Sequence, residues 1–174
     1  MTTGTIITIR HAEPDDYDRV IANVDAWWGG RQMASMLTRL FFTYFRPWTY
    51  VAVHDEAIVG FLAAFRSQTD PSQVYCHFVG VDPSWRGRGI GEALYQRLFV
   101  EAASQGCHEV LSVTAPTNRG SIAFHIRMGF APLPGLCHDC EVPFTSAYDG
   151  PGEDRVRFRR SLLDPPARSP SIVD

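Results

Sequence analysis

The most informative segment of the sequence runs from residue 79 to residue 91 and reads Val-Gly-Val-Asp-Pro-Ser-Trp-Arg-Gly-Arg-Gly-Ile-Gly. It begins as an apolar, β-branched run and ends as an amphipathic one, which predicts a passage from strand to helix. Glycines at alternate positions allow a tight turn with inward N–H groups, and at a helix start such a turn favours a pyrophosphate. Two arginines add forked cations suited to phosphate oxygens. The glycines and arginines concerned are Gly87, Gly89, Gly91, Arg86 and Arg88.

Two other phosphate motifs fail on particular letters. A dinucleotide fingerprint needs a small residue three positions after the second glycine, where this chain has Glu92. A triphosphate-binding loop needs a lysine, and all 16 basic residues of the chain are arginine. The alternative to a phosphate-binding turn is a glycine-rich surface turn without a ligand. The preceding strand and the following amphipathic helix argue against this alternative.

On both sides of this turn, the hydrophobic periodicity predicts the remaining helices and strands. Strands are expected at residues 5–9, 51–53, 58–65, 74–81, 110–114 and 156–162, and helices at 14–28, 33–44, 90–103 and 121–128. This order indicates a mixed α/β protein with one layered domain over residues 1–163. Residues 132–154 are rich in Pro, Gly and Asp, which is typical of a functional or mobile loop, and residues 164–174 are expected to be a disordered tail.

Composition limits the classes of partner and compartment. The 174 residues carry a net charge of −3, which argues against a basic nucleic-acid-binding surface. No stretch approaches the roughly 20 apolar residues of a membrane span, and no leader peptide is recognisable. Cys137 and Cys140 lack a second pair at zinc-site spacing, so we expect no metal and reduced cysteines in a cytoplasmic protein.

Two motifs together resemble the GNAT superfamily of acyl-CoA-dependent N-acetyltransferases. Arg86, Gly89 and Gly91 match the family's Arg/Gln-x-x-Gly-x-Gly/Ala motif, and further on Asn118, Ser121, Gly129 and Phe130 match its Asn-x-x-Ser/Ala and Gly-Phe pattern. The resemblance covers about residues 6–162. It implies a splayed mixed sheet of about seven strands with about four helices, and acetyl-CoA bound between the fourth and fifth strands.

The resemblance also implies which residues contact acetyl-CoA. The backbone N–H of Val79 would polarise the thioester, Val81 would pair with the pantetheine arm, and Gly80 would suit the strand bulge that family members carry. The implied cofactor-binding residues are Val79, Gly80, Val81, Arg86, Gly87, Arg88, Gly89, Ile90, Gly91, Asn118, Ser121 and His125.

Two histidines are candidates for proton transfer. Strand alternation places Tyr75, His77, Val79 and Val81 on one face, so that His77 would lie beside the thioester. In one branch of the family, a histidine at the position of His77 relays the amine's proton through water. His125 stands where many members have a tyrosine that donates to the leaving sulfur, and this departure leaves the donor's identity open. For His77, a hydrogen-bonded core histidine is the alternative; for Asn118, it is a helix N-cap.

The acceptor pocket is the least readable part of the sequence. The predicted acceptor-binding residues are Trp27, Trp28, Phe41, Tyr75, His77 and Asp139, although an aromatic stripe at helical spacing is also typical of a core. The leading hypothesis is an N-acetyltransferase acting on a small amine. A protein N-terminal or side-chain acetyltransferase and a non-catalytic acyl-CoA-binding domain are the alternatives. We expect neither a nucleic acid nor a membrane as partner, and a homodimer stays open.

Overall fold

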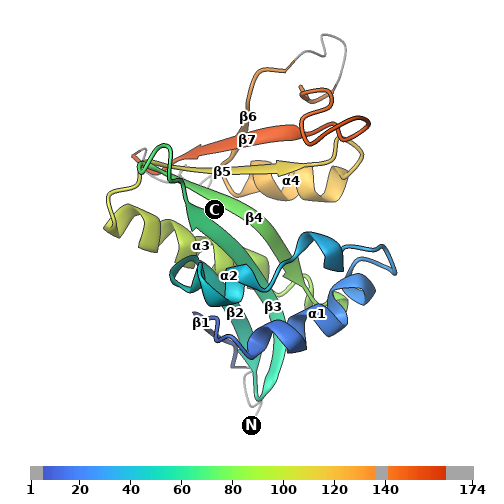
Figure 1. Ribbon diagram of the computed structural model, residues 1–174, viewed down its shortest axis with the longest axis vertical. Helices are drawn as coiled ribbons and strands as arrows, with labels where there is room; N and C mark the ends of the chain where they lie inside the picture. The colour runs from blue at the N-terminus through green and yellow to red at the C-terminus, as the bar shows by residue number, and fades with distance from the viewer. Residues whose placement is uncertain (1–5, 136–140, 164–174) are drawn as a thin grey trace, which may run out of the picture.

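The structure is a computed structural model that describes residues 6–135 and 141–163. One sheet of seven strands runs through it in the order β1-β2-β3-β4-β5-β7-β6 (Figure 1). The strands are β1 (Thr8–His11), β2 (Thr49–His54), β3 (Ala57–Arg66), β4 (Gln73–Val81), β5 (Glu109–Thr114), β6 (Ala131–Pro132) and β7 (Val156–Ser161). All neighbouring strands are antiparallel except β4 and β5, which are parallel.

Helices cover both faces of the sheet. The α-helices are α1 (Asp16–Trp27), α2 (Leu40–Thr43), α3 (Ile90–Ser104) and α4 (Arg119–Arg127), and short 3₁₀ turns lie at η1 (Ala34–Met36), η2 (Arg46–Trp48) and η3 (Pro83–Trp85). One core packs α3 and α4 against the sheet, and a second core packs α1 and α2 against the opposite face. We refer to these as the α3–α4 face and the α1–α2 face. The expected mixed, splayed sheet with four helices is confirmed.

The expected helix over residues 33–44 is wrong, because this segment divides into η1 and α2. Leu37 between them has extended backbone angles, φ −108° and ψ 99°. Asp25 stabilises the turn before η1, since its Oδ1 accepts from the N–H groups of Met33 and Ala34 at 2.7 and 2.8 Å. These contacts come from α1 and are invisible to local periodicity, which is why the pattern of apolar residues suggested one continuous helix.

The other boundaries differ from the expected ones by a few residues. The first strand begins later than expected, at Thr8, and the short β6 was not located by the sequence. Among the described helices, none combines the length and the apolarity that crossing a bilayer requires. Within residues 6–135 and 141–163, no three His, Cys, Asp or Glu side chains gather as a metal would need. Cys137, Cys140 and the predicted tail lie outside the described residues.

Candidate active site

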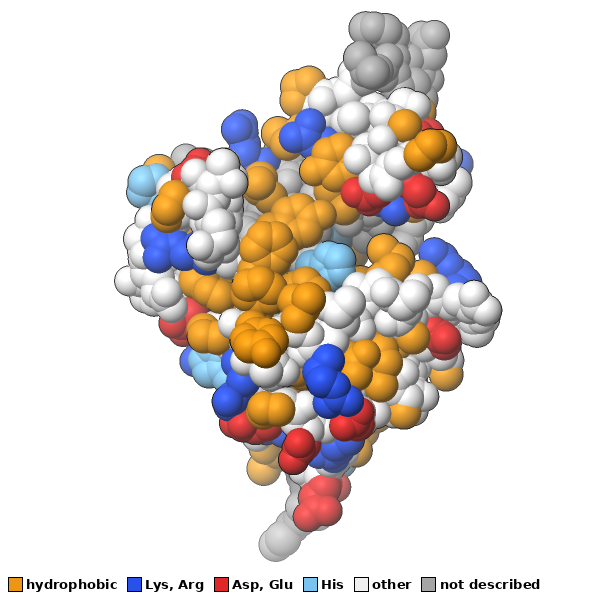
Figure 2. Space-filling model, viewed as in Figure 1, with side chains coloured by type: hydrophobic (Ala, Val, Ile, Leu, Met, Phe, Trp, Pro, Cys, Tyr) orange, Lys and Arg blue, Asp and Glu red, His pale blue; other side chains and the backbone are white. Residues whose placement is uncertain are grey.

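The sheet opens between its two parallel strands. Pairing of β4 with β5 runs from Gln73–Glu109 to Cys76–Ser112 and stops there, although both strands continue. Beyond this point the last five residues of β4 and the last two of β5 have no strand partner across the gap. Figure 2 shows this face of the molecule hollowed, with apolar side chains and a histidine side chain along the hollow.

A β-bulge lies in β4 at the point where the gap opens. Ala63 of β3 pairs with Phe78 and Ala64 pairs with Cys76, so His77 is the extra residue. A bulge shifts the alternation of side chains by one residue. The predicted common face of His77, Val79 and Val81 is therefore wrong.

The two faces of β4 can be read from what each side chain contacts. His77 stacks on Phe41 of α2 on the α1–α2 face, whereas Val79 and Val81 pack against the α3–α4 core. The bulge was expected at Gly80, and the structure gives Gly80 a different role. Trp28 packs over it so closely that a Cβ there would lie 2.7 Å from its Cζ3.

The imidazole of His77 has a defined orientation. Its Nε2 lies 2.7 Å from the carbonyl oxygen of Met36 in η1, and its ring stacks on Phe41 with centroids 4.8 Å apart and planes 8° apart. A carbonyl only accepts, so Nε2 carries the hydrogen that it donates to Met36. The neutral ring therefore keeps its lone pair on Nδ1.

The glycine-rich turn presents backbone N–H groups at the start of α3. Gly87 and Gly89 have φ of 74° and 77°, in the left-handed region that glycine tolerates, and no other atom lies near the Cβ position of either. The first helical bond runs from the Ala93 N–H to the Gly89 carbonyl at 2.9 Å. No described residue accepts from the N–H groups of residues 90–92 that precede it, as expected of a helix start that binds an anion.

The two arginines of the turn have different surroundings. Arg86 donates from Nε to the Val81 carbonyl at 3.1 Å and from Nη2 to the Trp27 carbonyl, so it joins the end of β4 to the end of α1. Arg88 is exposed, and its guanidinium lies 4.6 Å from the ring centroid of Trp85. Arg88 is therefore the more available of the two for a phosphate.

Helix α4 carries the second motif, and its first residues have a structural role. Asn118 is the N-cap, with Oδ1 accepting from the Ser121 N–H at 3.1 Å. Gly91 of α3 lets the two helices approach, since a Cβ there would lie 3.2 Å from the Phe124 ring. The N-cap interpretation of Asn118 is confirmed, and the residue lies in the turn between β5 and α4.

His125 lies in the core, with 2% of its surface exposed. Its Nδ1 lies 2.8 Å from the Ser121 carbonyl, so Nδ1 carries the hydrogen, and the Tyr95 hydroxyl donates to Nε2 at 3.0 Å. The ring stacks on Phe158 with planes 9° apart. Burial lowers the pKa of His125 below its ordinary value of 6.5. These contacts are those of a neutral structural histidine, and they occupy both ring nitrogens, so neither is free for the predicted donation to a leaving sulfur.

A cluster of polar groups surrounds His125 beneath the point where the gap opens. Ser112, the last residue of β5 that pairs with β4, donates to the Cys76 carbonyl at 3.3 Å and lies 3.2 Å from His125 Nε2. Burial raises the pKa of the Cys76 thiol to about 12, so this cysteine stays protonated and is not a nucleophile.

Most of the predicted aromatic wall is core. Trp27 and Phe41 are 6% exposed, and Trp28 stacks on Phe78 at 5.0 Å. Tyr75 differs, because it borders a cavity of about 60 Å³ on the α1–α2 face, shared with Tyr148 and Arg157. Asp139 lies outside the described residues.

Three further acidic residues could in principle bind a cationic amine, and each has a structural partner. Asp25 holds the turn before η1, Asp149 pairs with Arg155 at 2.7 Å, and Asp154 accepts from the Ala147 N–H at 2.8 Å. None of the three is left as an unpaired carboxylate for an ammonium group.

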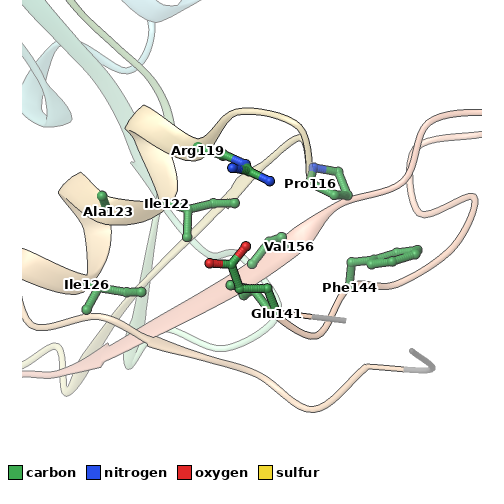
Figure 3. A pocket seen from close by; sticks show the side chains of 9 residues that line it. Pro116, Arg119, Ile122, Ala123, Ile126, Glu141, Phe144 and Val156 are labelled. Carbon is green, nitrogen blue, oxygen red and sulfur yellow. The ribbon is translucent and has the colours of Figure 1, made fainter. Parts of the chain in front are cut away.

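A larger cavity, of about 640 Å³, lies between α4 and the chain before β7 (Figure 3). Ile122, Ala123 and Ile126 of α4 form one side, and Glu141 and Phe144 come from the chain before β7. Among the described residues, its lining contains none from β4 or β5 and no predicted site residue.

Comparison with known proteins agrees with this geometry. The profile of the acetyltransferase (GNAT) family matches residues 15–130. The chain belongs to this family. It is 31% identical to the L-2,4-diaminobutyric acid acetyltransferase of Halalkalibacterium halodurans over 126 residues, 70% of this chain and 65% of that protein.

Two further similar proteins have names that give different acceptors. The chain is 30% identical to the N-alpha-acetyltransferase MAK3 of Arabidopsis thaliana over 142 residues, 79% of this chain and 68% of that protein. The diaminobutyrate acetyltransferase EctA of Paenibacillus lautus, solved with its substrate and coenzyme A, aligns with TM-score 0.69 and 20% identity over 94% of this chain and all of that one. At this identity the structural match concerns the fold alone. The chain spans 39% and 65% of the lengths of the first two curated relatives.

Sequence reasoning missed three features of this GNAT protein: the Met36 carbonyl, Tyr148 and Arg157. No side-chain pattern marks a carbonyl that contacts a residue 41 positions away. The alternating arginines Arg155, Arg157 and Arg159, one just before the last strand and two within it, are a visible signal.

Proposed function

We propose that this chain transfers the acetyl group of acetyl-CoA to the primary amine of a small molecule, by direct attack within a ternary complex. One observation carries the proposal: the gap between β4 and β5 has at its open end the N–H groups of the α3 start, for which no described residue is an acceptor, and at its apex an oriented histidine. Family membership supports acetyl-CoA as the donor, and the similarity to diaminobutyric acid acetyltransferases supports a small amine.

The residues of the glycine turn fit the diphosphate of acetyl-CoA. The N–H groups of residues 90–92 would donate to its oxygens at the positive end of α3, and Arg88 would add a cation. Val79 and Val81, on the part of β4 without a β5 partner, would offer backbone groups to the thioester and the pantetheine arm, with Asn118 and Ser121 on the other side of the gap. When bound, acetyl-CoA supplies the acetyl group as a thioester.

We assign His77 the removal of the amine's proton. The Met36 carbonyl holds the hydrogen of Nε2, which leaves the Nδ1 lone pair to accept a proton, directly or through one water. The stack on Phe41 fixes the ring plane, so the base is positioned before the acceptor arrives. No residue of the chain forms a covalent intermediate in this scheme, and the departing thiolate takes its proton from solvent.

Acetylation of a protein N-terminus is the second candidate, because the similarity to the Arabidopsis N-alpha-acetyltransferase covers more of this chain. Against it, the cavity that Tyr75 shares with Tyr148 of the loop before β7 has a volume of only about 60 Å³, whereas a peptide would need an open groove. A panel that contains both small amines and short peptides distinguishes the two functions.

The test is thiol release from acetyl-CoA in the presence of that panel. Replacing His77 by alanine should lower kcat by about 100-fold or more, because a positioned general base contributes on the order of 10²–10⁴. Acetyl-CoA affinity should stay unchanged, since His77 lies at the apex of the gap and away from the turn. His108→Ala is the control, because His108 is exposed at the start of β5.

Several results would contradict the assignment. No thiol release with any amine or peptide would leave acyl-CoA binding without transfer, the third alternative. Unchanged turnover in His77→Ala would show that His77 is not the general base. Alignment of the substrates and backbone polarisation would then be the source of catalysis.

A further inference from the structure

Three arginines alternate along one face of the sheet at β7. Arg155, Arg157 and Arg159 point to the α1–α2 face, because Val156 and Phe158 between them are buried in the α3–α4 core. The two outer arginines are neutralised. Arg155 pairs with Asp149 and Glu153, each at 2.7 Å, and Arg159 lies 3.7 Å from Glu109.

The middle arginine, Arg157, differs from its two neighbours within the part of the chain that the structure describes. Within the described residues, no carboxylate oxygen lies within 4.0 Å of Arg157. Its guanidinium lies 5.3 Å from the ring centroid of Tyr148, and its side chain borders the cavity next to Tyr75. An arginine placed between two neutralised neighbours, half-buried and facing a cavity, is a ready partner for an anion that is not part of this chain.

The register of the sheet places Arg157 at the level of the candidate base. Leu111 of β5 pairs with Tyr75 on one side and with Arg159 on the other. Two residues further along β5, Val113 pairs with Arg157 of β7. Two residues further along β4, across the gap, lies His77. Both side chains lie on the α1–α2 face.

The separation suits a single small molecule. Two strand spacings set the backbones of β4 and β7 about 10 Å apart where the strands are paired, and further apart where the gap opens. The long Arg157 side chain shortens this span, so one acceptor could place its amine at His77 and an anionic group at Arg157.

We propose that the acceptor is an amine that also carries a carboxylate, and that Arg157 binds this carboxylate. The inference rests on the proposed acetyl transfer and narrows its substrate class. Arginine suits a carboxylate because its fork donates two parallel hydrogen bonds. Diamines and polyamines without an anionic group would leave Arg157 unpaired and would add a second cation beside it, so we expect them to be poor acceptors.

The experiment compares matched pairs of amines. Lysine, ornithine and diaminobutyrate are each assayed by thiol release next to the diamine that remains when the carboxylate is removed. At least one amino acid should have a kcat/KM about 10-fold or more above its diamine. O-Phosphoethanolamine tests whether phosphate can replace the carboxylate.

Variants of β7 assign the preference to one side chain. Arg157→Gln should lower kcat/KM for the preferred amino acid by about 10- to 100-fold, the range for a hydrogen bond to a charged group, and leave its diamine and the KM of acetyl-CoA unchanged. Arg157→Lys should keep part of the preference. Arg159→Gln is the matched control, because it removes an arginine from the same face of the same strand.

The possible outcomes separate this inference from the proposed function. Equal kcat/KM for amino acids and diamines, or a preference that survives in Arg157→Gln, overturns the carboxylate site while acetyl transfer stands. A preference for O-phosphoethanolamine overturns the carboxylate in favour of phosphate. No transfer to any amine overturns the proposed function and this inference with it.

Discussion

Replacing Gly80 with alanine tests how tightly α1 packs on the strand that would bind acetyl-CoA. The added Cβ would lie 2.7 Å from Trp28 Cζ3 and 2.9 Å from Phe61 Cε1. Carbon atoms prefer about 3.5–4.0 Å, so the Trp28 ring would have to withdraw by about 1 Å. That ring has little room, because it already stacks on Phe78 at 5.0 Å. Overpacking of this kind costs about 1–3 kcal/mol, which lowers Tm by about 2–12 °C in a chain of this size.

The measurement is the free energy of unfolding from urea titrations, supported by thermal melts. In a Trp28→Leu background the obstructing ring is absent, so Gly80→Ala should cost at least about 1 kcal/mol less than in the wild-type chain. Gly120→Ala is the control, because the nearest atom to its added Cβ is 3.9 Å away, and in a helix it should stabilise by about 0.5–1 kcal/mol. An equal cost of Gly80→Ala in both backgrounds would refute the packing argument.

Two further predictions concern the turn and the buried histidine. Gly89→Val should abolish the stabilisation by acetyl-CoA, which is about 2.7 kcal/mol at 100 times Kd. Gly106→Val is the control, because it lies at an equally open position with φ of 76° and should cost similar strain while keeping the ligand's effect. If acetyl-CoA still stabilised Gly89→Val, its phosphates would bind elsewhere. Burial lowers the pKa of His125 in the folded chain below the ordinary value of 6.5 that it has in the unfolded chain. Below pH 6.5 the unfolded chain therefore binds more protons than the folded chain. The contribution of His125 to the free energy of unfolding is complete above pH 6.5 and is lost as the pH falls through the folded pKa. Urea titrations between about pH 5 and 7.5 should show this slope in the wild-type chain and a shallower one in His125→Leu, and identical slopes would contradict the prediction.

The sequence predicts the features of this fold that depend on neighbouring residues. The glycine turn, α3 and the Asn118 cap each follow from a local rule of backbone or capping chemistry, and each is present. The bulge at His77 is different, because it depends on how β4 aligns with β3, and Cys-His-Phe carries no glycine or proline to mark it. One shifted residue reversed the facing of the strand and separated His77 from Val79.

The arginines near the proposed acceptor site also depend on contacts between distant residues, which the local sequence does not predict. Each arginine of Arg155, Arg157 and Arg159 has the same sequence signal, an alternate position in an amphipathic strand. What distinguishes the middle one is the position of Asp149, Glu153 and Glu109, which reach β7 from the preceding loop and from β5. Pairing of this kind is a property of the folded chain, and no motif of the sequence encodes it.

The short contact between β4 and β5 has a mechanical consequence. Four residue pairs, from Gln73–Glu109 to Cys76–Ser112, join the two parts of the sheet, while the α3–α4 core continues beneath both. The two parts of the sheet are therefore joined along one short segment, and beyond it they are held together through their packing on that core. A change in the width of the gap would shift β4 relative to β5 where the two strands are not paired, and it would change the distance from His77 to Arg157 while the four pairs stay formed.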